Sequence, residues 1–321
     1  DAVLTRVDAV STRLARVAPI LKSFRQSVLA AATSGRLTED WRDINRPTSA
    51  QAKGQLDTIT QSRFQRMKKA KEAVERTNSE EFEIPNSWLW TSLDALTAKI
   101  VDGTHHTPTY VGEGVPFVSV KDIRDGVIDF SSTKFIAEVE HRELSKRCLV
   151  ERGDLLITKS GTIGRTALVK TDIPFSLFVS VALLKPASSA VNMRFIDLVL
   201  RHWVGSIDIS SRIVGSTIKN LHLVDMKVLG IPFPCLDEQA EIVRRVETLF
   251  AFADRLEARL KAAQTATERL TPALLAKAFR GELVPQDPDD EPASELLRRL
   301  QAASEHRAPA RAAGRGRKRS I

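Results

Sequence analysis

The sequence predicts an α+β protein in which a mixed α/β domain is flanked by two long helices that pair as an antiparallel coiled coil. Three observations lead to this prediction. Apolar residues recur at heptad spacing near both ends of the chain, the two end segments resemble each other, and the stretch between them alternates short β-rich runs with turns. With 321 residues, the chain is long enough for more than one folded unit.

The first long helix is predicted over residues 1–42. Its apolar residues follow steps of four and three, as in a coiled-coil seam: Val3, Val7, Val10, Leu14, Val17, Leu21, Phe24 and Val28. Gly35 then ends the helix, since glycine tolerates the positive φ of a C′ residue. Pro19 lies inside the seam and should kink or restart the helix.

Residues 43–83 are predicted to be a linker followed by a short helix. The linker is "DINRPTSAQAKGQ", and the basic run "LDTITQSRFQRMKKAKEAVERTN" is expected to form the helix.

Residues 84–234 are predicted to form the mixed α/β domain. Its expected strands lie in the β-rich runs "VPFVSV", "FIAEV", "DLLITK", "TALVK", "SLFVSVALLKP" and "MKVLGIPFP", and "NMRFIDLVLRHWVGS" has the pattern of a helix. Trp88 and Trp90 are expected to be packing residues.

The second long helix is predicted over residues 235–284. Its seam has the same period as the first: Ile242, Val246, Leu249, Ala253, Leu256, Leu260, Ala263, Thr267, Leu270 and Leu274. Its end, "ALLAKAFRGELVPQD", matches "SVLAAATSGRLTEDW" from the first helix, so that Gly281 corresponds to Gly35. Pro272 interrupts this seam as Pro19 interrupts the first. Two related helices on either side of one domain favour an antiparallel rod.

Residues 285–321 are predicted to be a flexible basic tail. From residue 307 onward the chain carries six cationic side chains and no acid, which accounts for most of the net charge of +8. Between residues 100 and 230 there are 16 Lys and Arg against 14 Asp and Glu, so the domain is barely basic.

No catalytic motif is found, and the chain is therefore predicted not to be an enzyme. The run "TKSGTIGRT" lacks the Gly-Lys-Ser/Thr order of a P-loop, and no G-x-S-x-G or G-x-G-x-x-G is present. His105 and His106 lack a third metal ligand, and Cys148 and Cys235 are expected to be isolated, buried thiols. We expect no metal or cofactor in this chain. With no signal-like start or membrane-spanning run, a cytoplasmic location is expected.

The domain's loops favour binding to duplex DNA instead. They present hydroxyls, imidazoles and single cations, which can contact phosphates and base edges. The candidate DNA-binding residues are Thr104, His105, His106, Thr107, Lys121, Lys134, Lys159, Ser160, Thr162, Arg165 and Lys219. The alternative is that the glycines of these loops only form tight turns and that Lys159 and Arg165 are solvated.

Several motifs resemble the specificity subunit of type I restriction-modification enzymes. In chain order they are "LKSFRQSVLAAATSGRLTEDWR", "FVSVKDI", "VERGDLLITKSGTIGRTALV", "GSTIKNLHLVDMKVLGIPFPCLDEQAEIVRRVETLF" and "LLAKAFRGELVPQD". The resemblance covers nearly the whole chain except the tail. It implies that residues 84–234 are a target-recognition domain and that the two helices are conserved spacers.

The resemblance also implies the partners. Members usually carry two target-recognition domains, each reading half of a split DNA site, and they are not catalytic themselves. Two methyltransferase subunits and the restriction/translocase subunits would bind this scaffold, and S-adenosylmethionine, ATP and Mg would belong to those partners.

Two questions stay open at the level of sequence. With one recognition domain, the chain is either the C-terminal portion of a longer subunit or a natural half-subunit that forms a homodimer. A different class of function is a coiled-coil protein-interaction scaffold without specific DNA binding.

Overall fold

The computed structural model describes residues 2–66, 72–76, 82–124, 126–206, 221–283, 289 and 291–305. The chain divides into two compact units. The larger is Arg16–Leu260, and the smaller combines Asp1–Ala15 with Lys261–Ile321.

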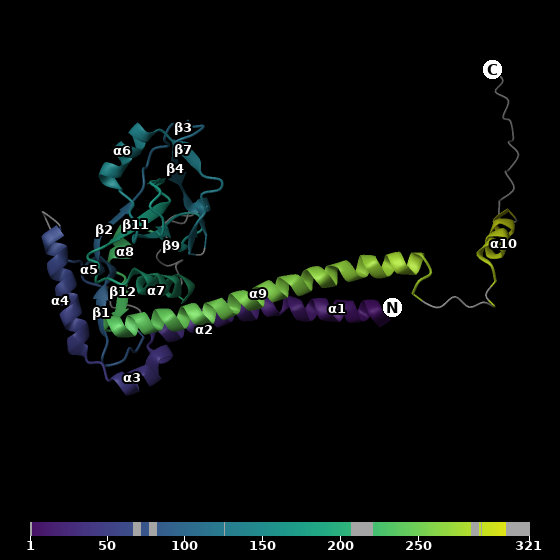
Figure 1. The fold of residues 1–321 in the computed structure, drawn as a ribbon, viewed down its shortest axis with the longest axis horizontal. Helices are drawn as coiled ribbons and strands as arrows, with labels where there is room; N and C mark the ends of the chain where they lie inside the picture. The colour runs from purple at the N-terminus through teal and green to yellow at the C-terminus, as the bar shows by residue number, and fades with distance from the viewer. Residues whose placement is uncertain are drawn as a thin grey trace, which may run out of the picture. The chain divides into compact units, whose positions relative to one another are not determined.

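The helices confirm the α part of the predicted α+β class (Figure 1). They are α1 (Ala2–Ala15), α2 (Val17–Thr33), α3 (Glu39–Asn45), α4 (Ser49–Arg66), α5 (Leu93–Leu96), α6 (Glu138–Arg147), α7 (Met193–Ser206), α8 (Leu223–Lys227), α9 (Leu236–Phe279) and α10 (Ala293–Glu305), with 3-10 turns η1 (Arg36–Thr38) and η2 (Val120–Asp122). None of the helices in the described part of the chain is long and apolar enough to cross a membrane.

The strands lie in the larger unit. They are β1 (Leu89–Ser92), β2 (Thr97–Asp102), β3 (Tyr110–Val111), β4 (Val115–Val118), β5 (Ile123–Arg124), β6 (Val127–Ile128), β7 (Lys134–Ile136), β8 (Leu155–Thr158), β9 (Thr166–Leu168), β10 (Ser176–Leu177), β11 (Val181–Pro186) and β12 (Gly230–Phe233). One sheet has the order β2-β11-β8-β9 and a second has the order β10-β4-β7-β3, while β1 pairs with β12 and β5 with β6.

The sheet β2-β11-β8-β9 is buried on both faces. All of its neighbouring strands are antiparallel, and successive side chains point to opposite faces. Ala182 and Leu184 of β11 belong to the main hydrophobic core, with residues of α2, α7 and α9. Val181 and Leu183 belong to a second core, with residues of β4 and β10. Burial on both faces explains why these strands read as continuous apolar runs.

Helices α2 and α9 pair in an antiparallel manner within the larger unit, as the sequence predicts. Arg25 of α2 bonds to Asp254 and Glu257 at 2.7 and 2.9 Å, whereas Leu37, just beyond α2, accepts a hydrogen bond from Arg245 near the start of α9. Residues later in the first segment therefore contact residues earlier in α9, which is the pattern of an antiparallel pair. Their apolar faces share the main core: Val28, Leu29 and Ala32 from α2, with Ile242, Val243 and Val246 from α9.

The helix ends agree with the predicted glycine signals. Gly35 and Gly281 have φ of +80° and +71°, each two residues after the last residue of its helix. Near Pro19 the helix restarts, because α1 ends at Ala15 and Pro19 occupies the first turn of α2, where its missing N–H is tolerated. By contrast, α9 continues through Pro272.

Several elements differ from the sequence prediction. Helix α4 begins at Ser49, within the expected linker, because it buries Ala52 and Ile59 in the main core. The run "FIAEV" passes from β7 directly into α6, and "SLFVSVALLKP" divides into β10 and β11 of different sheets. Helix α10 lies within residues expected to be a flexible tail, while residues 306–321 lie outside the described residues.

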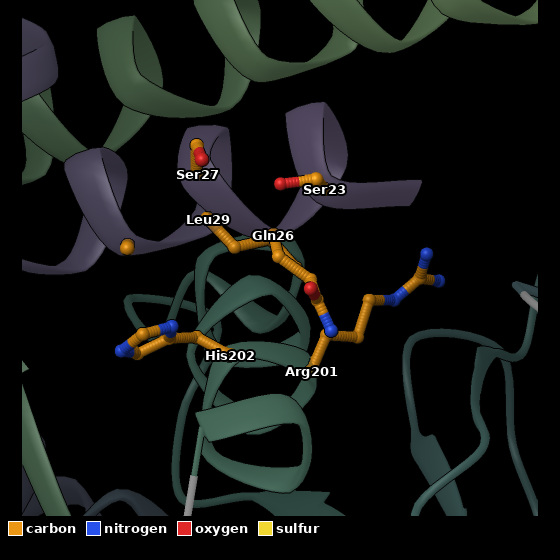
Figure 2. A pocket seen from close by; sticks show the side chains of 7 residues that line it. Ser23, Gln26, Ser27, Leu29, Arg201 and His202 are labelled. Carbon is orange, nitrogen blue, oxygen red and sulfur yellow. The ribbon is translucent and has the colours of Figure 1, made fainter. Parts of the chain in front are cut away.

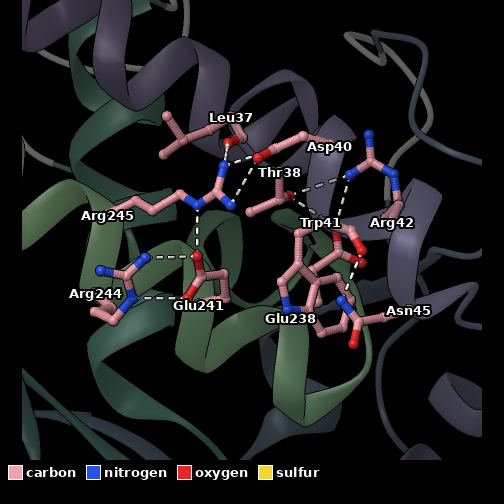
Figure 3. A network of polar contacts seen from close by, with 10 residues as sticks. All are labelled: Leu37, Thr38, Asp40, Trp41, Arg42, Asn45, Glu238, Glu241, Arg244 and Arg245. Atoms are coloured by element: carbon pink, nitrogen blue, oxygen red, sulfur yellow. Dashed lines mark hydrogen bonds and ion pairs between the residues drawn. The ribbon is translucent and has the colours of Figure 1, made fainter.

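A buried carboxylate joins α9 to the rest of the larger unit. Glu238, in the first turn of α9, accepts hydrogen bonds from Thr38 (2.8 Å), Arg42 (2.6 Å) and the indole N–H of Trp88 (2.9 Å). Figure 3 shows Thr38 and Arg42 converging on it from the segment after α2. Trp88 is buried, as the sequence predicts. A buried charge is tolerated only with such partners, so Glu238 holds three distant segments together.

A second ion-pair network lies beside it (Figure 3). Arg245 bonds to Asp40 at 2.6 Å and to Glu241 at 2.6 Å, and Arg244 also bonds to Glu241. The hydrogen bonds from Arg244 and Arg245 outweigh partial burial and lower the pKa of Glu241 from 4.5 to about 2. This network connects the segment after α2 to the second and third turns of α9.

We predict that Glu238→Gln lowers the free energy of unfolding by about 1–3 kcal/mol, because it leaves the guanidinium of Arg42 without its buried counter-charge. Urea unfolding followed by tryptophan fluorescence measures this. The matched control is Glu247→Gln, on the same helix, which removes an exposed ion pair with Arg194 and should change stability by less than about 0.5 kcal/mol. Equal losses in the two variants would contradict the special role of Glu238.

The ion pairs of Glu241 predict a pH dependence. Because the pKa of Glu241 is lower in the folded chain than its ordinary 4.5, its stabilising contribution is present above pH 4.5 and is lost as the pH falls toward about 2. The stability difference between the wild type and Glu241→Gln should therefore shrink over this interval. Unfolding measured at a series of pH values tests this, and a difference independent of pH would contradict it. The contribution is small, because Arg244 is largely exposed and solvent screens its ion pair with Glu241.

Candidate nucleic-acid interface

The sheet brings two of the predicted binding loops to one edge. Strands β2 and β8 both pair antiparallel with β11, which lies between them, so β2 and β8 run parallel to each other. Their carboxyl ends therefore meet at the same edge. The loop of residues 103–109 follows β2, and the loop of residues 159–165 follows β8.

The first loop is anchored at its base and exposed beyond it. The Thr104 amide donates to the Leu177 carbonyl at 2.9 Å, and its hydroxyl lies 2.8 Å from Nδ1 of His106. Thr104 is buried, whereas the side chains of His105, His106 and Thr107 are exposed. At Gly103 a Cβ would lie 2.0 Å from the Leu177 carbonyl oxygen, so only glycine allows this close approach.

The second loop is a closed turn. The amides of Gly164 and Arg165 donate to the carbonyl and the hydroxyl of Thr158, at 2.8 and 2.9 Å. Gly161 and Gly164 have positive φ, which agrees with the alternative that the glycines of this loop form tight turns. Thr162 is exposed, and Ser160 and Arg165 are half-buried.

The position of Lys159 differs from both sequence interpretations, in which it either contacts DNA or is solvated. Its side chain is buried, with 6% of the residue exposed, and its amine lies 3.1 Å from Oδ2 of Asp102 at the end of β2. Because it is buried against Asp102, it is neither solvated nor presented to an approaching phosphate. A buried amine needs such a partner to offset the loss of hydration.

Asp102 is the centre of this cluster. Besides Lys159, its carboxylate bonds to Arg147 of α6 at 2.5 Å and to Nε2 of His105 at 3.2 Å. Burial would raise the pKa of Asp102, but the hydrogen bonds and charges of Lys159 and His105 outweigh it, and the pKa lies below its ordinary value. Asp102 therefore remains ionised.

The other predicted cations lie on neighbouring elements. Lys121 is exposed on η2, and a Cβ at Gly161 would lie 3.6 Å from the adjacent Val120, so η2 borders the second loop. Lys134 of β7 lies in the other sheet, with its amine 4.0 Å from the ring centre of Tyr110. Lys219 lies outside the described residues.

A groove runs between α2 and α7 (Figure 2). A cavity of about 300 Å³ is lined there by Ser23, Gln26, Ser27, Leu29, Ala30, Arg201 and His202. A neighbouring cavity of about 570 Å³ is shared by α2, α7, α9 and the end of the second loop. Arg165 and Lys22 both line it, and in the described part of the chain neither has a carboxylate within ion-pair distance. Arg165 is therefore the cation of the second loop that is available to a ligand.

The described residues contain no cluster of three or more His, Cys, Asp and Glu side chains that could hold a metal ion. Cys148 and Cys235 are free and buried, as the sequence predicts. Burial raises the pKa of Cys148 to about 11, so this thiol is protonated at neutral pH.

Three residues of this region were not predicted from the sequence. Asp102 ends a β-rich run directly before Gly103, and an acid in that position was a usable signal for a buried partner. Arg147 and Tyr110 reach the site from α6 and β3, and no spacing in the sequence connects them to it.

Comparison with known proteins identifies relatives over most of the chain. Residues 106–264 match the family described as the type I restriction modification DNA specificity domain. The specificity subunit of the type I restriction enzyme EcoBI from Escherichia coli is 32% identical, over 94% of this chain and 60% of that protein. The EcoKI specificity subunit from Escherichia coli strain K12 is 28% identical over the same shares.

A solved structure concerned with complex assembly and conformational transition of the type I R-M system contains a chain of similar fold. It has a TM-score of 0.52 and 21% identity, over 79% of this chain and 59% of that one. The chain spans about 60% of the length of the two Escherichia coli relatives. Together, these findings show that residues 106–264 belong to the family of type I restriction-modification DNA specificity domains and that the chain is similar to specificity subunits over most of its length.

Proposed function

We propose that the chain is the DNA-recognition part of a type I restriction-modification specificity subunit, reading one half of a bipartite site. In this proposal, the chain holds methyltransferase and restriction subunits and performs no catalytic step itself. S-adenosylmethionine, ATP and Mg would act in those partner subunits. The observation that carries the proposal is the meeting of the two polar loops at one edge of the β2-β11-β8-β9 sheet, of which β8, β9 and β11 lie within the matched residues 106–264.

The edge has the chemistry that duplex DNA requires. His105, His106, Thr107 and Thr162 are exposed donors and acceptors for base edges and phosphates. Their backbone is held by hydrogen bonds and by tight glycine turns, so little conformational entropy is lost on binding. Lys121 and Arg165 supply the cations, while Lys159 acts from within, as a counter-ion to Asp102.

We predict that Arg165→Ala and Lys121→Ala each weaken duplex binding by about 1–3 kcal/mol, because each removes a cation from the proposed surface. Binding is measured by fluorescence anisotropy at several salt concentrations, with duplexes selected by the assembled complex. Arg152→Ala is the matched control. Arg152 is an exposed arginine at the opposite end of β8, paired with Asp172, and its removal should leave the affinity unchanged.

The same titration separates the two classes of function. Neutralising phosphates releases counterions, so DNA affinity should fall steeply as salt rises. A protein-interaction scaffold without a DNA role needs no such dependence. Unchanged binding in both Arg165→Ala and Lys121→Ala would remove the sheet edge from the proposal.

The repeated helix ends indicate a further partner. At the end of α2, Leu29 is 8% exposed, because α7 and the start of α9 cover it. The matching Leu275 at the end of α9 is 45% exposed, and Phe279 beside it is 91% exposed. We propose that a second recognition unit of similar construction covers this second end.

The second unit is not an identical copy of this chain. The site formed by α7 and the start of α9 is already filled by the chain's own α2 end, including Thr38 and Arg42 on Glu238. A second copy in the same conformation therefore has no vacant site to offer. A non-identical recognition unit with that site open would fit.

We predict that the 321-residue chain is a monomer in solution. Light scattering across a range of concentrations measures this, with Leu275→Asp as a comparison. A tight homodimer that Leu275→Asp dissociates would contradict the argument and would support a symmetric half-subunit instead.

A further inference from the structure

We infer that Asp102 is a positioning residue that couples the loop of residues 103–109 to the loop of residues 159–165, so that the two present one fixed surface to DNA. The inference deepens the proposed function and rests on it. Asp102 itself is buried and would make no contact with the duplex.

The carboxylate of Asp102 contacts both loops at once. Oδ2 lies 3.1 Å from the amine of Lys159, the first residue of the second loop. Oδ1 lies 3.2 Å from Nε2 of His105, in the first loop, and 2.5 Å from a guanidinium nitrogen of Arg147. Arg147 also donates to the carbonyl of Gly103 at 3.3 Å, so that it holds the base of the first loop from α6.

The strand pairing explains why one carboxylate reaches both loops. Ala182 of β11 pairs with Asp102 of β2, and the adjacent Val181 pairs with Thr158 of β8. Since neighbouring strands are about 4.8 Å apart, β2 and β8 are separated by about 10 Å. The side chain of Lys159 crosses the end of β11 and bridges this gap.

Apart from this pair, the bonds of the second loop are mostly internal or run to β8, whereas those of the first loop run mostly to the segment of residues 177–179. The second loop is closed on Thr158 through Gly164 and Arg165. The first loop is held by Leu177 and Val179 through Thr104. The Asp102–Lys159 pair is thus a side-chain link from one loop to the other. Both of its members are buried, and neither can be hydrated if the other is removed.

Amide hydrogen exchange on the chain without DNA tests the coupling. The probes are the amides of Thr104, Lys159, Gly164 and Arg165, all of which are hydrogen-bonded. Asp102→Asn should speed exchange about tenfold at Thr104 in the first loop and also at Gly164 in the second. Lys159→Met should speed exchange at Thr104, although it changes only the second loop. It serves as the second variant should Asp102→Asn fail to fold.

The matched control is Asp154→Asn. Asp154 is also a buried carboxylate paired with a lysine, Lys185 at 2.7 Å, but it lies at the opposite end of β8. It should lower stability without speeding exchange in either loop. The inference is overturned if Asp102→Asn affects Thr104 alone, if Lys159→Met leaves Thr104 unchanged, or if Asp154→Asn speeds exchange in both loops equally.

DNA selectivity distinguishes a positioning role from a purely structural one, because a loss of stability alone would not change it. Asp102→Asn should lower the ratio of affinities for the selected and scrambled duplexes about tenfold, because misplaced loops lose base contacts. Its salt dependence should stay that of the wild type, because the phosphate-facing cations remain. An unchanged ratio overturns the inference. Absence of salt-dependent binding by the wild type would instead overturn the proposed function, while the exchange result would still decide the coupling.

Discussion

The burial of Glu238 is the constraint on which the larger unit depends. A carboxylate with no exposed surface must have partners, and they come from two other places in the chain: Thr38 and Arg42 after α2, and Trp88 at the start of the domain. Because a buried carboxylate that loses a partner is less well compensated, Glu238 favours the arrangement in which these segments meet. The return of α9 along α2 is thereby fixed to the domain that separates them in sequence.

The same physics operates at the far edge of the sheet. Asp102 is buried among Lys159, Arg147 and His105, and the loops of the proposed DNA surface depend on it as the helices depend on Glu238. In both places a buried acid selects one arrangement of segments that local bonding alone would leave adjustable. The two residues differ in what they position: Glu238 holds the helices α2 and α9 against the domain, whereas Asp102 holds the loops of the proposed DNA surface.

The two related helix ends show how context decides the role of a repeated sequence. Both end at a glycine with positive φ, so the local chemistry is the same. One end is covered by α7 and the start of α9, and the other exposes Leu275 and Phe279. An apolar surface of this kind is typical of a protein interface, and its covered counterpart indicates what kind of surface completes it.

Much of the fold followed from local signals in the sequence: the heptad seams predicted the antiparallel helices, Gly35 and Gly281 their ends, and the runs "DLLITK" and "TALVK" the strands β8 and β9. The candidate loops were also predicted, because their glycines and hydroxyls are visible in the chain itself. Tertiary structure alone decided that α4 forms within an expected linker, that Lys159 is buried while Arg165 remains available, and that Asp102 joins the two loops. Local patterns report on a residue's own strand or helix. Burial and charge pairing depend instead on which distant segments meet in the folded chain. Asp102 and Lys159, for example, are 57 residues apart in the sequence.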